Sequence, residues 1–261
     1  MKLEVRDLSC GYSPEHPVQK YINFSVESGE VCCVLGPNGC GKSTLFKSML
    51  GLVEPLGGGV YIDNSDISKW SAKKLARRVA YVPQTFNSTQ FPYKVREIVQ
   101  MGRLNRLGLI GQPKDEDYLS AEEAMEACGI YHLRDEVYTD ISGGELQMTM
   151  IARALTQHPQ MLIMDEPTAA LDYGNAVRVI KKIRELAEAG FAVLMTTHSP
   201  DHAFMCNSLV VLLRKDEPPT CGRAVDVITD RNMKRAYGVN VKIVEYVNEK
   251  NEICRKCAPV F

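Results

Sequence analysis

The sequence predicts an α/β fold built around a largely parallel sheet, and two kinds of pattern carry this prediction. Short, continuous apolar runs at Val31–Leu35, Met161–Met164 and Ala192–Thr196 are typical of parallel strands that are buried on both faces. Apolar residues at helical spacing follow the first run at 42–50 and separate the second run from the third at 175–188. Strands therefore alternate with helices, as they do in α/β proteins.

The first eighty residues also predict antiparallel strands. Alternating apolar residues begin at Leu3 and Val5 and recur at 22–26, with a Gly-Tyr-Ser-Pro turn signal between them. Further strands are expected at 60–62, after three consecutive glycines, and at 79–82. The buried parallel strands are thus accompanied by an antiparallel β part.

A helical block interrupts the alternation of strands and helices. From about 94 to 157 the sequence contains three helix-like segments, at 95–101, 121–128 and 146–155, which are separated by loops with glycine and proline. We therefore expect an inserted α-helical part before the strand at 161–164 resumes the α/β pattern.

Composition and charge exclude several function classes. The chain has 261 residues, enough to bury a substantial core in one large domain or two joined domains. Its 31 basic and 32 acidic residues give a net charge of −1, so no electrostatic field favours nucleic acid or anionic lipid as a partner. No stretch approaches the roughly 18 apolar residues of a membrane span, and the first residues lack the apolar core of a signal peptide. We expect a cytoplasmic protein that does not cross a bilayer.

The nine cysteines are interpreted as thiols, because Cys32, Cys33 and others lie in apolar contexts. The last segment predicts a hairpin, with strand-like residues at 241–247 and from 253 on either side of a polar turn. Cys254 and Cys257 in this segment form one C-x-x-C without a second pair or a nearby histidine. We interpret the pair as incidental, with a redox role or a metal site shared between subunits as open alternatives.

A glycine-rich loop carries the main chemical signal. It matches G-x-x-x-x-G-K-[ST] and lies between the strand at 31–35 and the helix that begins at Lys42. Its glycines let backbone N–H groups and the positive end of the helix dipole approach phosphates. Lys42 is expected to reach the β- and γ-phosphates, and the Ser43 hydroxyl to ligate Mg²⁺ that arrives with the nucleotide. The loop consists of Gly36, Pro37, Asn38, Gly39, Cys40, Gly41, Lys42, Ser43 and Thr44.

An acidic pair follows the apolar strand at 161–164. Strand ends are where open α/β sheets bind ligands, and successive side chains on a strand diverge, so the two acids can have different roles. We expect Asp165 to be a partner of Mg²⁺ and Glu166 to orient or deprotonate the attacking water. Taken alone, such a pair more often marks the start of a solvated loop, but the phosphate loop favours catalysis.

Five further matches identify a family. Residues 141–145, Ile-Ser-Gly-Gly-Glu, closely resemble the signature of ABC ATPases, and 167–172, directly after the acidic pair, resemble their D-loop. Tyr12 is similar to the aromatic residue that stacks on adenine, Gln84 to the Q-loop glutamine and His198 to the switch histidine. The resemblance runs from about residue 3 to 245. It departs at Ile141, where leucine is usual, and at Glu145, where glutamine is commonest.

The resemblance implies a P-loop NTPase core of the RecA-like type, an antiparallel β subdomain and an α-helical subdomain inserted at about 90–157. The ABC ATPase domain would span 1–245 and be followed by a C-terminal hairpin or tail at 246–261. It also implies roles for the matched residues. The catalytic residues would be Glu166, His198 and Gln84, and the Mg²⁺ ligands would be Ser43, Gln84 and Asp165. The nucleotide would be contacted by Tyr12, the loop at 36–44, Ser142, Gly143, Gly144, Glu145 and Asp172.

The residues at 142–144 are expected to form a second anion-binding helix N-terminus, because serine is a good cap and glycines expose N–H groups. Since the chain has only one set of motifs, the resemblance implies a symmetric homodimer with two ATP molecules at its interface.

The resemblance also implies a partner in the membrane. Residues 93–103 are similar to the region of importer ATPases that docks on a permease, and 227–241 to the tail of the subfamily that serves iron–siderophore, haem and cobalamin uptake. The chain would then lie at the cytoplasmic face of the membrane, and a substrate-binding protein would act on it through the permease. Alternatives are a soluble assembly ATPase, such as one for iron–sulfur clusters, and an importer of another cargo such as molybdate.

Overall fold

The computed structural model describes residues 1–84, 91–104, 114–215 and 217–260. The chain forms two compact units. Unit 1 comprises Met1–Trp70 and Ile183–Phe261, and unit 2 comprises Ser71–Lys182.

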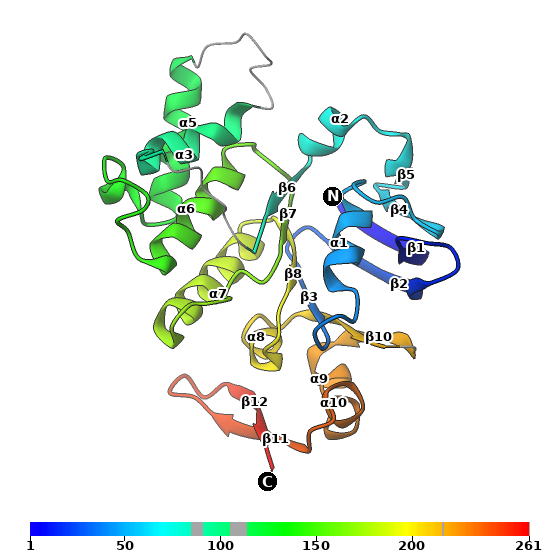
Figure 1. The fold of residues 1–261 in the computed structure, drawn as a ribbon. Coiled ribbons are helices and arrows are strands. Elements are labelled where there is room, and N and C mark those ends of the chain that lie inside the picture. The colour runs from blue at the N-terminus through cyan, green and yellow to red at the C-terminus, as the bar shows by residue number, and fades with distance from the viewer. Residues whose placement is uncertain (85–90, 105–113, 216, 261) are drawn as a thin grey trace. The chain divides into compact units, whose positions relative to one another are not determined.

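Unit 1 contains an antiparallel sheet in the strand order β2-β1-β4-β5 (Figure 1). Its strands are β1 (Lys2–Gly11), β2 (Pro17–Glu27), β4 (Gly57–Ile62) and β5 (Ser65–Asp66). The alternating apolar residues of β1 and β2 point into the core, as the period of two predicts. The three glycines expected to precede the third strand are part of β4, in which Gly57 pairs with Ser9 and Gly59 with Arg6 of β1.

A second sheet of unit 1 is mostly parallel. The strand β3 (Val31–Leu35) pairs in parallel with β8 (Ala192–Thr196) and with β9 (Leu209–Arg214). At the edge, β10 (Glu217–Arg223) runs antiparallel to β9. Every residue of β3 and β8 is buried, which explains their continuous apolar sequences.

Helices and a hairpin complete unit 1. The helices are α1 (Lys42–Met49), α8 (Pro200–Met205), α9 (Ala224–Val227) and α10 (Asp230–Tyr237), and a short 3-10 helix spans Ile67–Lys69. The strands β11 (Val241–Val247) and β12 (Ile253–Pro259) pair antiparallel, and β12 packs against α8.

The hairpin places the two cysteines of the C-x-x-C pair on different faces. Cys254 and Cys257 are both in β12, three positions apart, so their side chains point to opposite faces of the hairpin. They therefore do not hold one metal ion between them. All nine cysteines are free thiols, and no group of three or more His, Cys, Asp or Glu side chains in the described ranges could hold a metal ion.

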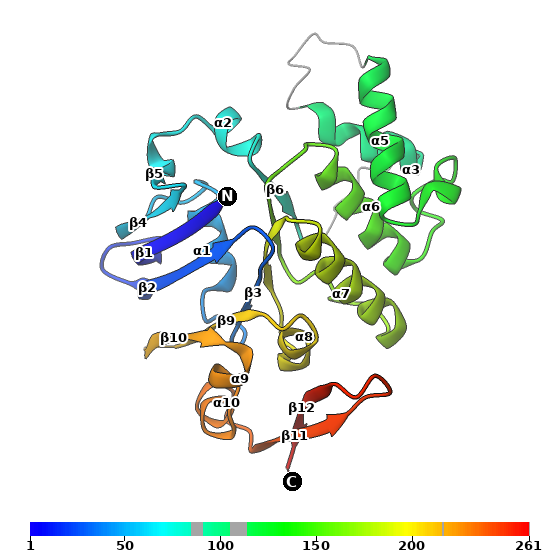
Figure 2. The ribbon, with the colours of Figure 1, turned by 180° about the vertical axis from the view of Figure 1, so that it is seen from behind.

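Unit 2 contains a pair of parallel strands, β6 (Val79–Val82) and β7 (Met161–Met164), together with helices. The helices are α2 (Ala72–Ala76), α3 (Val95–Gln100), α5 (Asp115–Ala127) and α6 (Gly143–Leu155), with short 3-10 helices at Met101–Arg103 and Tyr131–Leu133. The helix α7 (Tyr173–Glu188) begins in unit 2, and its residues from Ile183 on belong to unit 1. Of these, α3, α5 and α6 pack against one another, and they lie side by side in both views (Figure 1, Figure 2).

A buried ion pair stabilises this helical block. The Arg103 and Asp117 side chains are each 4% exposed, and the guanidinium also donates to the carbonyl of Thr156 at 3.0 Å. The Asp117 carboxylate accepts a further hydrogen bond from the backbone N–H of Lys114, which lowers its pKa, as does Arg103. Because loss of one partner would leave the other charge buried, either truncation is expected to cost about 3–5 kcal/mol of stability.

Candidate nucleotide site

The glycine-rich loop joins β3 to α1 and has the backbone that its glycines permit. Gly39 and Gly41 have φ values of +76° and +104°, in the left-handed region. A Cβ on Gly41 would lie 2.6 Å from Val18 Cγ1, so this position also requires a residue without a side chain. The space around Gly39 is open within 4 Å. The loop backbone therefore turns through left-handed conformations, and at Gly39 a ligand can approach it.

The N-terminus of α1 offers uncapped donors. Gly41 is its N-cap, so no side chain caps the helix, and its first turn contains no acidic residue. Lys42 is only 6% exposed, and its Nζ donates to the carbonyl oxygens of Gly36 at 2.8 Å and Pro37 at 3.2 Å. Ser43 is exposed on the same turn. A helix start without a capping side chain and a lysine ammonium inside the loop are chemically complementary to phosphate.

Tyr12 is presented to solvent beside a lysine. Its side chain is 68% exposed, and Lys47 Nζ donates to its hydroxyl at 3.2 Å and lies 5.7 Å from the ring centroid. Hydrogen bonds from Lys47 and Thr44 lower the pKa of the phenol. The sequence patterns gave no signal for Lys47, which fixes a ring whose face is available for stacking.

The loop after β8 is held on both sides of His198. The Thr197 hydroxyl accepts from the backbone N–H of Ser199 at 3.2 Å and lies 2.8 Å from His202 Nδ1. Burial lowers the pKa of His202, while Asp201 partly opposes this. When the His202 ring is neutral, its Nδ1 accepts a hydrogen bond from the Thr197 hydroxyl. The hydroxyl then donates one hydrogen bond and accepts another, from Ser199. His198 itself is exposed.

In unit 2, Asp165 is buried at the end of β7. Its backbone N–H donates to the carbonyl of Val82 at 2.9 Å and so extends the ladder between β6 and β7. Burial raises the pKa of the neighbouring Tyr81 to about 12, and the Asp165 charge and a hydrogen bond to its carboxylate add to the shift. Tyr81, like Lys47 beside Tyr12, is a residue that the sequence analysis missed.

Glu166 and Gln84 meet within unit 2. Gln84 Nε2 donates to Glu166 Oε2 at 2.9 Å, which joins residues 82 positions apart. Glu166 has a φ of +48°, an unusual value for a residue with a side chain, and its carbonyl accepts from the N–H of Ala169 at 2.9 Å. The chain therefore turns sharply after β7 and directs the second acid differently from the first.

The signature residues form the start of α6. Ser142 is the N-cap, as expected, and the helix begins at Gly143, three residues before the predicted start. A Cβ on Gly144 would lie 2.5 Å from Asn175 Cγ, whereas one on Gly143 would only touch Leu171 Cδ2 at 3.4 Å. Gly144 is thus required for packing against the start of α7, while Gly143 is exposed and sterically unconstrained.

Asp172 caps α7. Its carboxylate accepts from the backbone N–H of Asn175 at 2.9 Å and from Asn175 Nδ2 at 2.6 Å. These bonds, above all the one from the backbone N–H, lower the pKa of Asp172. In this position the carboxylate stabilises the helix that packs against the signature.

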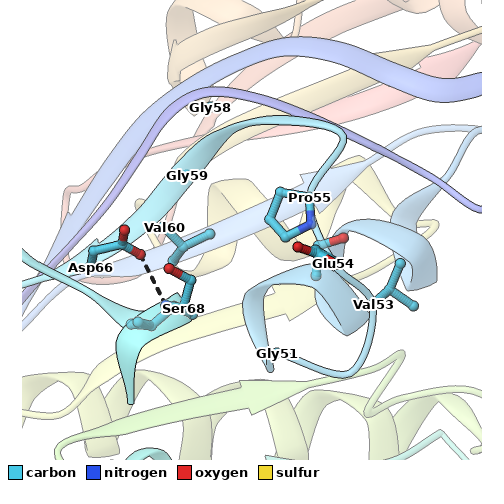
Figure 3. A pocket seen from close by; sticks show the side chains of 11 residues that line it. Gly51, Val53, Glu54, Pro55, Gly58, Gly59, Val60, Asp66 and Ser68 are labelled. Atoms are coloured by element: carbon cyan, nitrogen blue, oxygen red, sulfur yellow. Dashed lines mark hydrogen bonds between the residues drawn. The ribbon is translucent and has the colours of Figure 1, made fainter. Parts of the chain in front are cut away.

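A separate cavity of about 360 Å³ lies between the end of α1 and the start of β4 (Figure 3). Glu54 and Asp66 line it, and Asp66 accepts from the backbone N–H of Ser68 at 2.9 Å. Two carboxylates repel phosphate groups, and none of the predicted nucleotide contacts lines this cavity. It is therefore not a triphosphate site.

The predicted site residues thus fall into two groups. Tyr12, the loop at 36–44 and His198 lie in unit 1. Gln84, the acidic pair and the two motifs at 141–145 and 167–172 lie in unit 2. Within unit 2 the structure brings Gln84 to Glu166 and the signature to the start of α7.

Fold and loop define a P-loop ATPase, and the comparison with known proteins specifies the family. Residues 19–169 match the ABC transporter family. This is more than half of the chain, so the chain belongs to the ABC transporter family and is an ATP-binding protein that hydrolyses ATP.

Known relatives extend over nearly the whole chain. An ABC transporter ATP-binding protein of Haemophilus influenzae is 38% identical over 94% of this chain and 92% of its own length. The hemin import ATP-binding protein HmuV of Rhodococcus jostii is 34% identical (88% and 78% covered), and the molybdate import ATP-binding protein MolC of H. influenzae is 33% identical (88% and 86% covered).

A solved structure, described as an inward-facing conformation of a metal-chelate type ABC transporter, superposes with a TM-score of 0.88 at 29% identity. The match covers 99% of this chain and 97% of the other. This likeness confirms the P-loop NTPase fold with its antiparallel β and helical parts. In the parts of the chain that the structure describes, no helix is long and apolar enough to cross a membrane.

Proposed function

We propose that this chain is the ATP-hydrolysing subunit of an importer, and that two copies of it drive a membrane permease from the cytoplasmic face. The observation that carries the proposal is a difference between two helix N-termini. The start of α1 carries Lys42, whereas the start of α6 follows Ser142 and has no lysine in its first turn. A head-to-tail pair completes both, because the phosphate loop of one copy then faces the signature of the other.

Each copy would bind one ATP with its own loop. Tyr12 stacks on the adenine ring, N–H groups at the start of α1 hold the phosphates, and Lys42 neutralises charge on the β- and γ-phosphates. The other copy contributes two parts to the site. Its signature donates hydrogen bonds to the γ-phosphate, and its D-loop lies beside them. The contacts proposed for this second copy are Ser142, Gly143, Gly144, Glu145 and Asp172.

Hydrolysis would depend on the residues at the strand ends. Glu166 orients or deprotonates the attacking water, as a general base does, and His198 contacts the γ-phosphate. The hydrogen bond from Gln84 supports this role of Glu166, because it fixes the carboxylate that must face the water. Binding of ATP favours the closed pair, and hydrolysis allows the pair to open.

Mg²⁺ would be held by oxygen atoms of Ser43, Gln84 and Asp165. The residues fit this ion, since Mg²⁺ prefers hard oxygen ligands. The amide nitrogen of Gln84 is used by Glu166, so its amide oxygen remains as the acceptor. The ion would neutralise phosphate charge when it is bound with ATP.

The start of α3 is the proposed contact with the permease. Phe91 is 61% exposed, and its ring centroid lies 6.1 Å from that of Tyr93. Exposed aromatic residues are typical of protein interfaces. The helical subdomain at about 90–157 would present this surface to the permease, and a substrate-binding protein would act only through the permease.

We propose an iron chelate, haem or cobalamin as the cargo. The hemin importer and the metal-chelate transporter among the similar proteins support this class. The molybdate importer keeps molybdate as the second candidate cargo, at nearly the same identity. A soluble assembly ATPase is disfavoured, because the similar proteins named as importers match over most of this chain.

A substitution at the proposed base tests the function. Glu166→Gln is expected to bind Mg-ATP while turnover falls by roughly 10²- to 10⁴-fold, the range for loss of a general base. The ATP-bound pair should then persist and be measurable by sedimentation. Glu123→Gln, on the exposed side of α5, is the matched control and should hydrolyse ATP normally. Undiminished hydrolysis by Glu166→Gln would contradict the assignment of Glu166 as the general base.

A further inference from the structure

The N-terminus of α6 carries an anion of its own, unlike that of α1. Glu145 Oε2 accepts hydrogen bonds from the Ser142 hydroxyl at 2.7 Å and from the Ser142 backbone N–H at 2.8 Å. In return the Ser142 oxygen accepts from the Glu145 backbone N–H at 3.4 Å. The first turn of α1 contains no acidic residue. The serine that would reach the γ-phosphate of the other copy is therefore bonded to a carboxylate.

Several charges surround this carboxylate. The two bonds from Ser142 lower the pKa of Glu145 most, and His132 and Arg178 lower it further. Arg178, in α7, also lowers the pKa of Asp172. The cluster thus contains two carboxylates, one guanidinium and one imidazole. Glu145 is held ionised at the place where a second anion would have to bind.

The start of α6 packs closely against α7. Gly144 approaches Asn175 so closely that a Cβ would lie 2.5 Å from Asn175 Cγ, and Asn175 is bonded to Asp172 through both its backbone and its side chain. The backbone at the start of α6 therefore has little room to shift and carry the carboxylate away. A phosphate that binds the Ser142 hydroxyl must displace the Glu145 side chain by rotation.

We propose that the Glu145 carboxylate competes with the γ-phosphate of the other copy for the Ser142 donors and so raises the ATP concentration at which two copies associate. Glu145 is then a positioning residue that acts through Ser142. The inference rests on the proposed function, since the competing phosphate belongs to ATP held by a second copy. Like charges brought together at an interface oppose association, so the carboxylate weakens the ATP-dependent association of two copies.

A simple capping role makes a different prediction. Glutamate and glutamine serve equally at this position of a capping box, because either accepts from the N-cap backbone N–H. If Glu145 only caps α6, replacement by glutamine should leave association unchanged. If its charge competes with phosphate, the same replacement should favour association, because it keeps the cap and removes the charge.

The experiment uses full-length protein with Glu166→Gln as the parent, so that hydrolysis does not deplete the ATP-bound pair. The dimer fraction is measured by sedimentation against Mg-ATP concentration in 50 and 500 mM salt. Adding Glu145→Gln should lower the midpoint about three- to tenfold at low salt, and less at high salt because salt screens the exposed charge. The control Glu122→Gln removes the same charge from the exposed side of α5 and should leave the midpoint unchanged.

Glu145→Asp separates charge from hydrogen bonding, because the shorter side chain keeps the charge and reaches Ser142 less well. This variant should lower the midpoint less than Glu145→Gln does, because it weakens the bonds to Ser142 but leaves the charge in place. An unchanged or raised midpoint in Glu145→Gln, or an equal decrease in Glu145→Asp, would overturn the inference. Failure of the parent to associate in ATP at any concentration would instead overturn the proposed function.

Discussion

At the scale of single residues, the structure adds partners to the residues that the motifs predicted. Spacing along the chain was enough to predict Lys42, Glu166 and Ser142, because their motifs are local. Lys47 beside Tyr12 and Tyr81 beside Asp165 come from other segments, which only the fold brings near. A single sequence contains no signal for such contacts, since they depend on how strands and helices pack.

His202, five positions after Thr197, is a local partner that the motifs did not predict, and it gives a prediction for the pH dependence of stability. Burial lowers its pKa below the ordinary value of 6.5, so between the two values the unfolded chain binds more protons than the folded chain. The free energy of unfolding should therefore fall as the pH falls below 6.5. His202→Asn keeps a group that can bond Thr197 but does not titrate, so its stability should depend less on pH in this window.

Urea unfolding of both proteins between pH 5 and pH 8 measures the difference. At pH 8 the ring is neutral in the folded and unfolded chains, so that value provides the baseline for the substitution itself. Stability curves that stay parallel down to pH 5 would show that His202 contributes nothing to the pH dependence.

At the scale of elements, the fully buried strands β3, β7 and β8 were predicted with their bounds, whereas the mostly buried strand β9 and the edge strand β10 were not predicted. Burial on both faces leaves a continuous apolar run, which explains why these three strands were recognised. The strand β6 also has the predicted bounds, although Tyr81 in it is exposed. The strand β10 contains two consecutive prolines, which disfavour a strand in the middle of a sheet but are tolerated here because β10 lies at the edge. The start of α6 was placed too late since its first two residues are glycines.

The two signature glycines of α6 give a matched pair of substitutions. Gly143→Asp adds a side chain that meets only Leu171 in the monomer, so the protein should fold and bind ATP at its own loop. The added charge should block closure against a second copy, so turnover should fall by at least about tenfold. Equilibrium nucleotide binding and the ATPase rate, measured on the same preparation, should therefore separate.

Gly144→Asp is the contrasting variant. Its side chain collides with Asn175, so this protein should lose thermal stability as well as turnover. Equal loss of ATP binding and turnover in a stable Gly143→Asp would contradict a signature that acts across the interface and would favour one that acts on its own loop.

At the scale of the whole molecule, the fold and the ATPase class followed from ordered motifs, whereas the partners did not. The domain limits at 1–245 and 246–261 remain predictions, as do the homodimer and the permease. The chain carries no chemistry that selects a cargo, because in this proposal the cargo contacts the permease and the substrate-binding protein. Composition and motif spacing in this chain therefore do not depend on which cargo is transported.

The cargo prediction must accordingly be tested on the assembled transporter. If the cargo is an iron chelate, haem or cobalamin, the ATPase rate of the complex in vesicles should rise severalfold when the substrate-binding protein is loaded with that chelate. The reason is that a loaded binding protein shifts the permease, and through it the two ATPase subunits, toward the closed pair. Uptake should require ATP and be lost in Glu166→Gln, while the Glu123→Gln control should transport normally. A panel in which siderophores, haem and cobalamin neither stimulate hydrolysis nor enter the vesicles, while molybdate does both, would replace the cargo class and leave the ATPase assignment intact.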